Sequence, residues 1–83
     1  MNVTAEISMY PLRDDFIPAI DSVIEKLNSF GELQVQTFAT ATTLIGDYDR
    51  VMDALKETIA WSYERYGTSV FAVKIIPGYE PAA

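Results

Sequence analysis

The chain contains no cysteine and no histidine. Without cysteine it forms neither disulfides nor thiolate metal sites. The lack of histidine removes the commonest general base and the commonest metal ligand of proteins. Basic residues are scarce as well, six against twelve acidic ones, and the net charge of −6 argues against nucleic acid and anionic membranes as partners. We therefore expect no metal, no cofactor, no nucleic acid and no membrane among its partners.

Long hydrophobic runs are also missing. The chain enters strand-forming residues at once, without a signal peptide or a transmembrane segment, and we expect a cytoplasmic protein. Its composition, 49% hydrophobic and 22% charged, is typical of a globular chain. We expect residues 1–83 to form a single domain, whose small core makes association a source of extra stability.

Four strand-like and two helix-like segments follow one another along the sequence. Val3 to Pro11 alternates strictly between apolar and polar residues, which indicates a strand with one buried and one open face. The later segments are a helix from Phe16 to Phe30 between Asp15 as N-cap and Gly31, strands from Leu33 to about Thr40 and from Thr42 to Ile45, a helix after Gly46-Asp47 that ends at Gly67, and a strand from Val70 to Ile76. The apolar stripe expected for the second helix is Tyr48, Val51, Met52, Leu55, Ile59, Ser62, Tyr63 and Tyr66. The tail from Tyr79 to Ala83 is expected to be loose.

This order predicts the α+β ferredoxin-like fold, βαββαβ. Right-handed crossovers give an antiparallel four-stranded sheet of order 4-1-3-2, with both helices on one face. The first and third strands are then neighbours in the middle of the sheet. Leu33 and Val35 look core-facing, which places Thr37 on the helix side unless a bulge intervenes. Counting does not settle whether Thr42 or Thr43 shares a face with Ser8.

Two groups of polar side chains suggest a ligand site. Thr4, Glu6, Ser8 and Tyr10 fall on one side of the first strand, and Thr37, Thr40, Thr42 and Thr43 lie in the second strand pair. The predicted sheet brings the two groups side by side, where hydroxyls and a carboxylate suit a small hydrogen-bonding ligand. The candidate ligand-binding residues are Glu6, Ser8, Tyr10, Thr37, Thr40 and Thr42. The alternatives are a solvated Glu6, a strand face covered in a dimer, and threonines present for β-propensity.

Three stretches of the chain form a recognisable set: Ser8-Met9-Tyr10-Pro11-Leu12, Asp14-Asp15-Phe16-Ile17, and Thr37 followed by Thr42-Thr43-Leu44-Ile45-Gly46. Together they resemble the YkoF-like thiamin/hydroxymethylpyrimidine-binding family. The resemblance covers nearly the whole chain and implies a ferredoxin-like fold that binds thiamin or its pyrimidine precursor noncovalently, in uptake or salvage. It implies ligand contacts from Ser8, Tyr10, Thr37 and Thr42. The founding type of the family carries two such domains in one chain, so a homodimer or higher homo-oligomer would supply the second one here.

Enzymes on this fold need groups that the sequence does not offer. Acylphosphatase-like chemistry needs an arginine anion cradle, and Arg13 is alone without a Gly-rich anion loop. Nucleoside-diphosphate-kinase chemistry needs a histidine, and RNA binding of the RRM kind needs aromatic and basic strand positions. We therefore expect a protein that is not an enzyme. The alternatives to thiamin binding are a structural oligomerisation domain and a regulatory domain of the amino-acid-binding type.

The last strand bears on assembly. In a four-stranded sheet with helices on one face only, the other face and the edges stay open. Either Val70, Ala72 and Ile76 or Phe71, Val73 and Ile75 would then remain in water. The sequence predicts at least a homodimer, formed through the open face or an edge.

Overall fold

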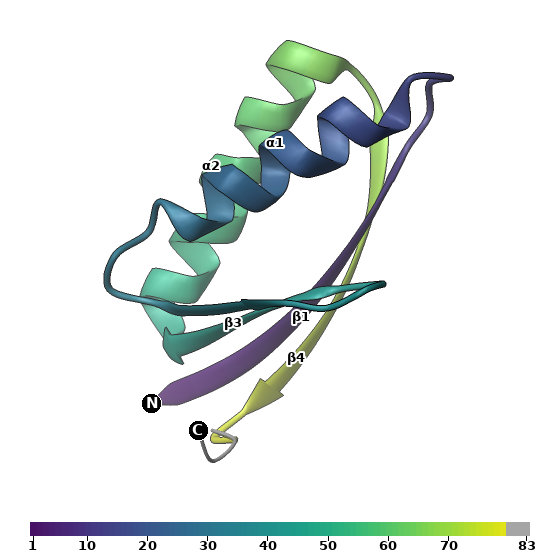
Figure 1. The fold of residues 1–83 in the computed structure, drawn as a ribbon. Coiled ribbons are helices and arrows are strands. Elements are labelled where there is room, and N and C mark those ends of the chain that lie inside the picture. Colours follow the sequence, from purple (N-terminus) through teal and green to yellow (C-terminus); the bar gives the residue numbers. More distant parts are fainter. Residues whose placement is uncertain (80–83) are drawn as a thin grey trace.

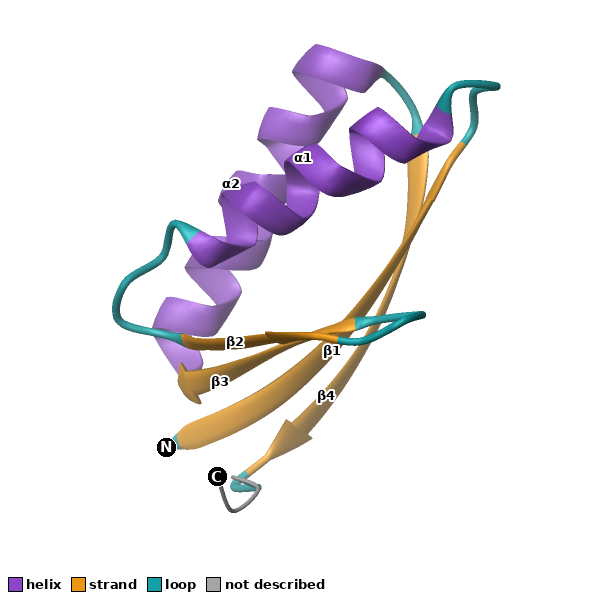
Figure 2. Ribbon diagram, in the orientation of Figure 1, coloured by secondary structure: helices purple, strands orange, loops and turns teal. Residues whose placement is uncertain are grey.

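The structure, a computed structural model, describes residues 1–79. Its elements are β1 (Asn2–Pro11), α1 (Phe16–Asn28), β2 (Gln34–Thr37), β3 (Thr42–Asp47), α2 (Tyr48–Tyr66) and β4 (Ser69–Pro77). The strands form one antiparallel sheet of order β2-β3-β1-β4, and both helices cover the same face of it (Figures 1 and 2). The predicted α+β ferredoxin-like fold and its strand order are confirmed.

The registers of the ladders decide which residues share a face. Residues directly opposite each other in an antiparallel pair point to the same side of the sheet. Ile7 lies opposite Thr42, and Thr42 lies opposite Thr37, so both threonines join the buried side of β1 beneath the helices. Glu6 lies opposite Thr43, which therefore belongs to the open face with Ser8. No bulge intervenes in β2, and Thr37 lies on the helix side as Leu33 and Val35 indicate.

The core fills the space between the helices and the middle of the sheet. Its largest fully buried side chains include Leu27 of α1, Val51 of α2, and Val3 and Leu44 of the two central strands. Ala5 opposite Leu44 continues this layer. The apolar half of the alternating first strand therefore faces the helices throughout, as its period of two predicts.

Several element ends differ from the sequence-based bounds for local reasons. Helix α1 ends at Asn28 rather than Phe30, because the amides of Ser29 and Phe30 bond three residues back, which tightens the last turn. Strand β2 ends at Thr37 rather than about Thr40, because the Phe38 amide donates to the Ala41 carbonyl and closes the hairpin. Asp15 is the N-cap residue, yet its carboxylate makes no cap hydrogen bond.

The C-terminal end of the described chain is tied to the sheet. The Thr4 hydroxyl donates to the Tyr79 carbonyl at 2.8 Å, and the Gly78 amide donates to the Asn2 carbonyl at 2.8 Å. The expectation of a loose tail was therefore wrong for Tyr79, and the rest of that tail lies outside the described residues.

The buried side of α2 is not the stripe expected from its large apolar residues. Val51, Ala54, Leu55, Thr58 and Ser62 are buried. Four members of the expected stripe are exposed instead: Tyr48, Met52, Ile59 and Tyr63. Small side chains allow a helix backbone to approach a sheet closely, so the small residues of α2 face inward and the bulky ones flank them. The predicted stripe was built from large apolar side chains at helical spacing, and it was wrong for these four residues.

This arrangement leaves buried hydroxyls without partners. Among the described residues, Ser62 Oγ finds no hydrogen-bond donor or acceptor, although the side chain is wholly buried. Ser62→Ala is expected to raise the free energy of unfolding by about 1 kcal/mol, because an unsatisfied buried hydroxyl costs roughly 1–3 kcal/mol and alanine suits a helix better. Urea denaturation measures this. Ser22→Ala is the comparison: it removes the acceptor of the Tyr66 hydroxyl, 2.6 Å away, and should lower stability. A loss of stability in Ser62→Ala would contradict the description of Ser62 Oγ as a buried hydroxyl without a hydrogen-bond partner.

Candidate functional site

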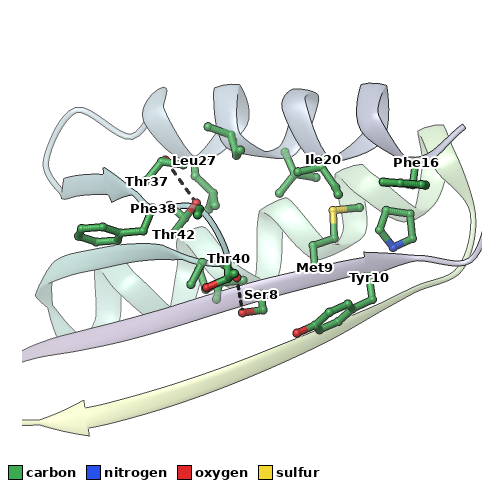
Figure 3. A pocket seen from close by; sticks show the side chains of 16 residues that line it. Ser8, Met9, Tyr10, Phe16, Ile20, Leu27, Thr37, Phe38, Thr40 and Thr42 are labelled. Carbon is green, nitrogen blue, oxygen red and sulfur yellow. Dashed lines mark hydrogen bonds between the residues drawn. The ribbon is translucent and has the colours of Figure 1, made fainter.

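A cavity of about 400 Å³ opens between α1 and the end of the sheet where β1 finishes (Figure 3). Its walls come from three elements: the C-terminal half of β1, the inner side of α1, and the hairpin that joins β2 to β3. Among the described residues that line it, none carries a charged side chain. The volume lies in the range typical of small-molecule sites, roughly 300–1,000 Å³.

One end of the cavity carries a pair of hydroxyls. Thr37 Oγ1 lies 3.3 Å from Thr42 Oγ1, and either oxygen can be the donor (Figure 3). Thr42 is only 5% exposed, whereas Thr37, on the edge strand, is open to water. The register of β2 against β3 brings these hydroxyls together, because it places the two residues directly opposite each other on the helix side of the hairpin. The pair can present either a proton or a lone pair to a ligand.

Ser8 and Tyr10 reach the cavity from the other side of the sheet. The Ser8 hydroxyl donates to the Thr40 carbonyl at 2.9 Å, so it ties β1 to the hairpin loop (Figure 3). Tyr10 lines the mouth, while its ring points away from α1 and is 57% exposed. Five of the six sequence-predicted residues, Ser8, Tyr10, Thr37, Thr40 and Thr42, thus border one cavity.

Glu6 is the sixth, and the structure does not bring it to the cavity. It lies on the open face, opposite Thr43 and Lys74, and its Oε1 is 3.7 Å from Lys74 Nζ. Both side chains of this ion pair are largely open to solvent. The two polar groups expected side by side therefore meet only at the end of the sheet, with Thr37 and Thr42 on one face and the Ser8 side chain on the other.

The apolar walls are the part of the site that the sequence did not single out. Met9 extends from β1 toward Phe16 and Ile20 of α1, and Val23, Ile24 and Leu27 continue the same wall (Figure 3). The α1 residues of this wall were expected to pack in the core, yet only Val23 and Leu27 among them are fully buried. An apolar helical stripe has the same pattern whether it packs against a sheet or lines a hollow. In the structure Ile20 and Ile24 are only half-buried, so these two residues line a hollow rather than pack fully against the sheet.

The loop between β1 and α1 contains an ion pair close to the mouth. Arg13 Nε lies 2.6 Å from Asp15 Oδ1, and Arg13 Nη2 lies 3.0 Å from Oδ2. The hydrogen bonds that Arg13 donates to Asp15 hold the pKa of the Asp15 carboxyl below its ordinary value and raise the pKa of the Arg13 guanidinium. The guanidinium also lies over the Tyr66 ring, 5.5 Å from its centre. The only arginine near the site is thus already engaged within the described chain.

Residues 1–79 contain neither a cluster of metal ligands nor a membrane-spanning helix. No group of three or more acidic side chains is arranged so that it could hold a metal ion. No helix among these residues combines the length and the apolar character needed to cross a membrane.

Known proteins share this fold and sequence pattern. The model of the YKOF-related family matches residues 2–70, which includes β1, α1 and the hairpin that build the cavity. The comparison with curated proteins finds no match.

Several solved structures superimpose on the chain over most of its length. A candidate thiamine biosynthesis/salvage protein from Thermotoga maritima gives a TM-score of 0.83 at 27% identity, covering 90% of this chain and 82% of that one. A Streptococcus pneumoniae protein gives a TM-score of 0.87 at 27% identity, covering 95% of this chain and 89% of that one. A hypothetical protein from Methanocaldococcus jannascii gives a TM-score of 0.80 at 28% identity, covering 98% of this chain and 84% of that one.

Proposed function

The chain belongs to the YkoF-related family, and on that premise we propose that it binds thiamin or its hydroxymethylpyrimidine moiety in the cavity under α1, for uptake or salvage. The observation that carries the proposal is the cavity itself, with apolar walls and a hydroxyl pair at one end. The similarity to the Thermotoga maritima candidate thiamine biosynthesis/salvage protein supports the choice of ligand class.

The chemistry of the lining suits an aminopyrimidine. The flat ring fits between the Met9 thioether and the side chains of α1, because thioethers and aliphatic groups pack well against aromatic rings. The ring nitrogens accept hydrogen bonds and the exocyclic amine donates them, and the Thr37–Thr42 pair can meet either need. Burying a charge in a cavity without a counter-charge is costly, so the thiazolium of thiamin belongs at the mouth, near the Tyr10 ring.

We propose that this binding is noncatalytic and that the chain works in the cytoplasm as a homodimer or higher homo-oligomer. The lining offers hydroxyls and apolar groups, whose ordinary chemistry at neutral pH is to hold a ligand. A structural or amino-acid-binding domain remains the alternative. A thermal-shift screen separates them, because a ligand that binds the folded chain raises the melting temperature and a purely structural domain has no such ligand.

Hydroxyl removal tests the contacts. Thr42→Val should weaken the binding of hydroxymethylpyrimidine by about 0.5–1.5 kcal/mol, the net value of one hydrogen bond, which is roughly two- to tenfold. The measurement is a calorimetric titration. Thr43→Val is the matched control, since it changes the same residue type one position along β3, on the open face and outside the cavity lining. Glu6→Gln should also leave affinity unchanged. Equal affinity in Thr42→Val and wild type would remove Thr42 from the contacts.

A further inference from the structure

The sheet divides at the end where the cavity opens. Strands β1 and β3 are paired as far as Ile7 opposite Thr42, and beyond this pair β1 continues to Pro11 with β4 as its one partner strand. The hairpin between β2 and β3 runs out beside the end of β1 without a ladder to it (Figure 2). The cavity lies at this division, and both the end of β1 and the hairpin line it. Its shape therefore depends on where the hairpin lies relative to β1.

The turn of the hairpin, residues 38–41, supplies much of one wall, and we call it the hairpin tip. All four of its residues line the cavity, and three of them are exposed. The Phe38 amide donates to the Ala41 carbonyl at 2.8 Å, which closes the turn but bonds the tip only to itself. Segments with little buried surface and few hydrogen bonds to the rest of the fold open at a low free-energy cost. The position of this wall therefore depends on what holds the tip to β1.

The Ser8 hydroxyl makes that connection. It donates to the Thr40 carbonyl at 2.9 Å, and among residues 1–79 this is the one hydrogen bond between β1 and the hairpin tip (Figure 3). Ser8 directly follows the last residue of β1 that pairs with β3, so its hydroxyl spans the division at the point where it begins. Its side chain lies on the open face of the sheet, whereas Thr37 and Thr42 lie on the helix side. A hydroxyl has a single proton to donate, and the Thr40 carbonyl already accepts it.

We propose that Ser8 is a positioning residue of the ligand site, which holds the hairpin tip against β1 through the Thr40 carbonyl and does not touch the ligand. This inference rests on the proposed function, and it replaces the ligand contact that the family resemblance implies for Ser8. When only a fraction of molecules has the binding-competent arrangement, the apparent affinity falls by that fraction. Holding the tip in place keeps this fraction high before the ligand arrives.

One hydrogen bond matters at this place because little else holds the tip. The net value of a single bond shifts an equilibrium between a held and a released tip by roughly two- to tenfold. Thr43 provides the comparison: its hydroxyl donates to the Gln36 carbonyl at 3.4 Å, also on the open face, but the two residues are directly opposite each other in the β2–β3 ladder. The backbone already joins the strands there, so the Thr43 hydroxyl is not needed to keep the tip in place.

Hydrogen exchange in the ligand-free protein tests the connection. Ser8→Ala is expected to speed exchange of the Phe38 amide by roughly two- to tenfold, because a tip released from β1 opens more often. Ser8→Thr keeps a hydroxyl on a residue that suits strands and should restore the slow exchange. Thr43→Val, the matched control, should leave the exchange of the Phe38 amide as in wild type. Unchanged exchange in Ser8→Ala would overturn this inference and would leave the proposed function untouched.

Calorimetric titration of the same variants tests the role in binding. Ser8→Ala should weaken hydroxymethylpyrimidine and thiamin by the same factor, roughly two- to tenfold, because the competent fraction is the same for every ligand that needs the held tip. Ser8→Thr should bind both as wild type does. Faster exchange with unchanged affinity would overturn the positioning role, and weaker binding with unchanged exchange would make Ser8 a ligand contact instead. Absence of binding to wild type would overturn the proposed function, which the exchange measurement does not test.

Discussion

Replacing Ile20 by tryptophan is expected to abolish the binding of both thiamin and hydroxymethylpyrimidine. Ile20 lines the cavity from α1, facing Met9 across the space that the ligand ring would occupy (Figure 3). An indole in this position takes up that space. Because small ligands bury most of their surface in such pockets, affinity should fall by about a hundredfold or more. Calorimetric titration measures the loss.

Ile17→Trp is the matched control for this variant. Ile17 lies on the same helix, is exposed, and does not line the cavity. It should bind ligand as wild type does. Circular dichroism melts of both variants check that the fold is kept, since the larger side chain of Ile20→Trp fills existing space. Unimpaired binding in a folded Ile20→Trp would place the ligand elsewhere on the molecule.

Leu44→Ala is expected to have the largest effect on stability. Leu44 is fully buried in β3, between Ala5 and Val35 on the helix side of the sheet. Removing a buried leucine side chain costs roughly 2–5 kcal/mol, through lost transfer free energy and the void that remains. Small domains have only about 5–15 kcal/mol in all, so much of the stability would be lost.

Urea denaturation at constant protein concentration measures that change. Leu12→Ala, in the exposed loop after β1, is the comparison and should shift the free energy of unfolding by less than about 0.5 kcal/mol. Similar values for the two variants would contradict the description of the core.

The fold could be predicted because several local signals agree. The strict alternation of β1, the helical stripe of α1 and the glycine that ends α2 each point to the same order of elements. Gly67 ends α2 with a φ of 76°, a conformation that favours glycine, and its place in the sequence is readable without a structure. Ferredoxin-like topology then follows from right-handed crossovers.

The faces of the hairpin could not be predicted in the same way. Whether Thr42 or Thr43 points to the helices depends on how many residues form the turn after Thr37, and a shift of one residue reverses every side chain. The Phe38–Ala41 hydrogen bond fixes that number in the structure. The candidate site therefore included threonines that line the cavity, while the side of the sheet that each one faces could not be assigned from the sequence.

The cavity itself has no signature in the sequence. Ile20 and Ile24 occupy ordinary core positions of an amphipathic helix, and only the spacing between α1 and the sheet makes them a wall rather than a packed layer. Glu6 shows the opposite difficulty. It shares the alternating strand with Ser8 and Tyr10, but it lies on the open face opposite Thr43 and Lys74 and does not line the cavity.

The most direct test of the proposed site is one calorimetric series with hydroxymethylpyrimidine and thiamin on wild type, Thr42→Val and Thr43→Val. We expect saturable binding of one ligand per chain, of similar strength for both compounds because they share the buried pyrimidine. We also expect a two- to tenfold loss of affinity, the value of about one hydrogen bond, in Thr42→Val only. Absence of saturable binding to wild type, or equal affinity in all three proteins, would contradict the proposed site.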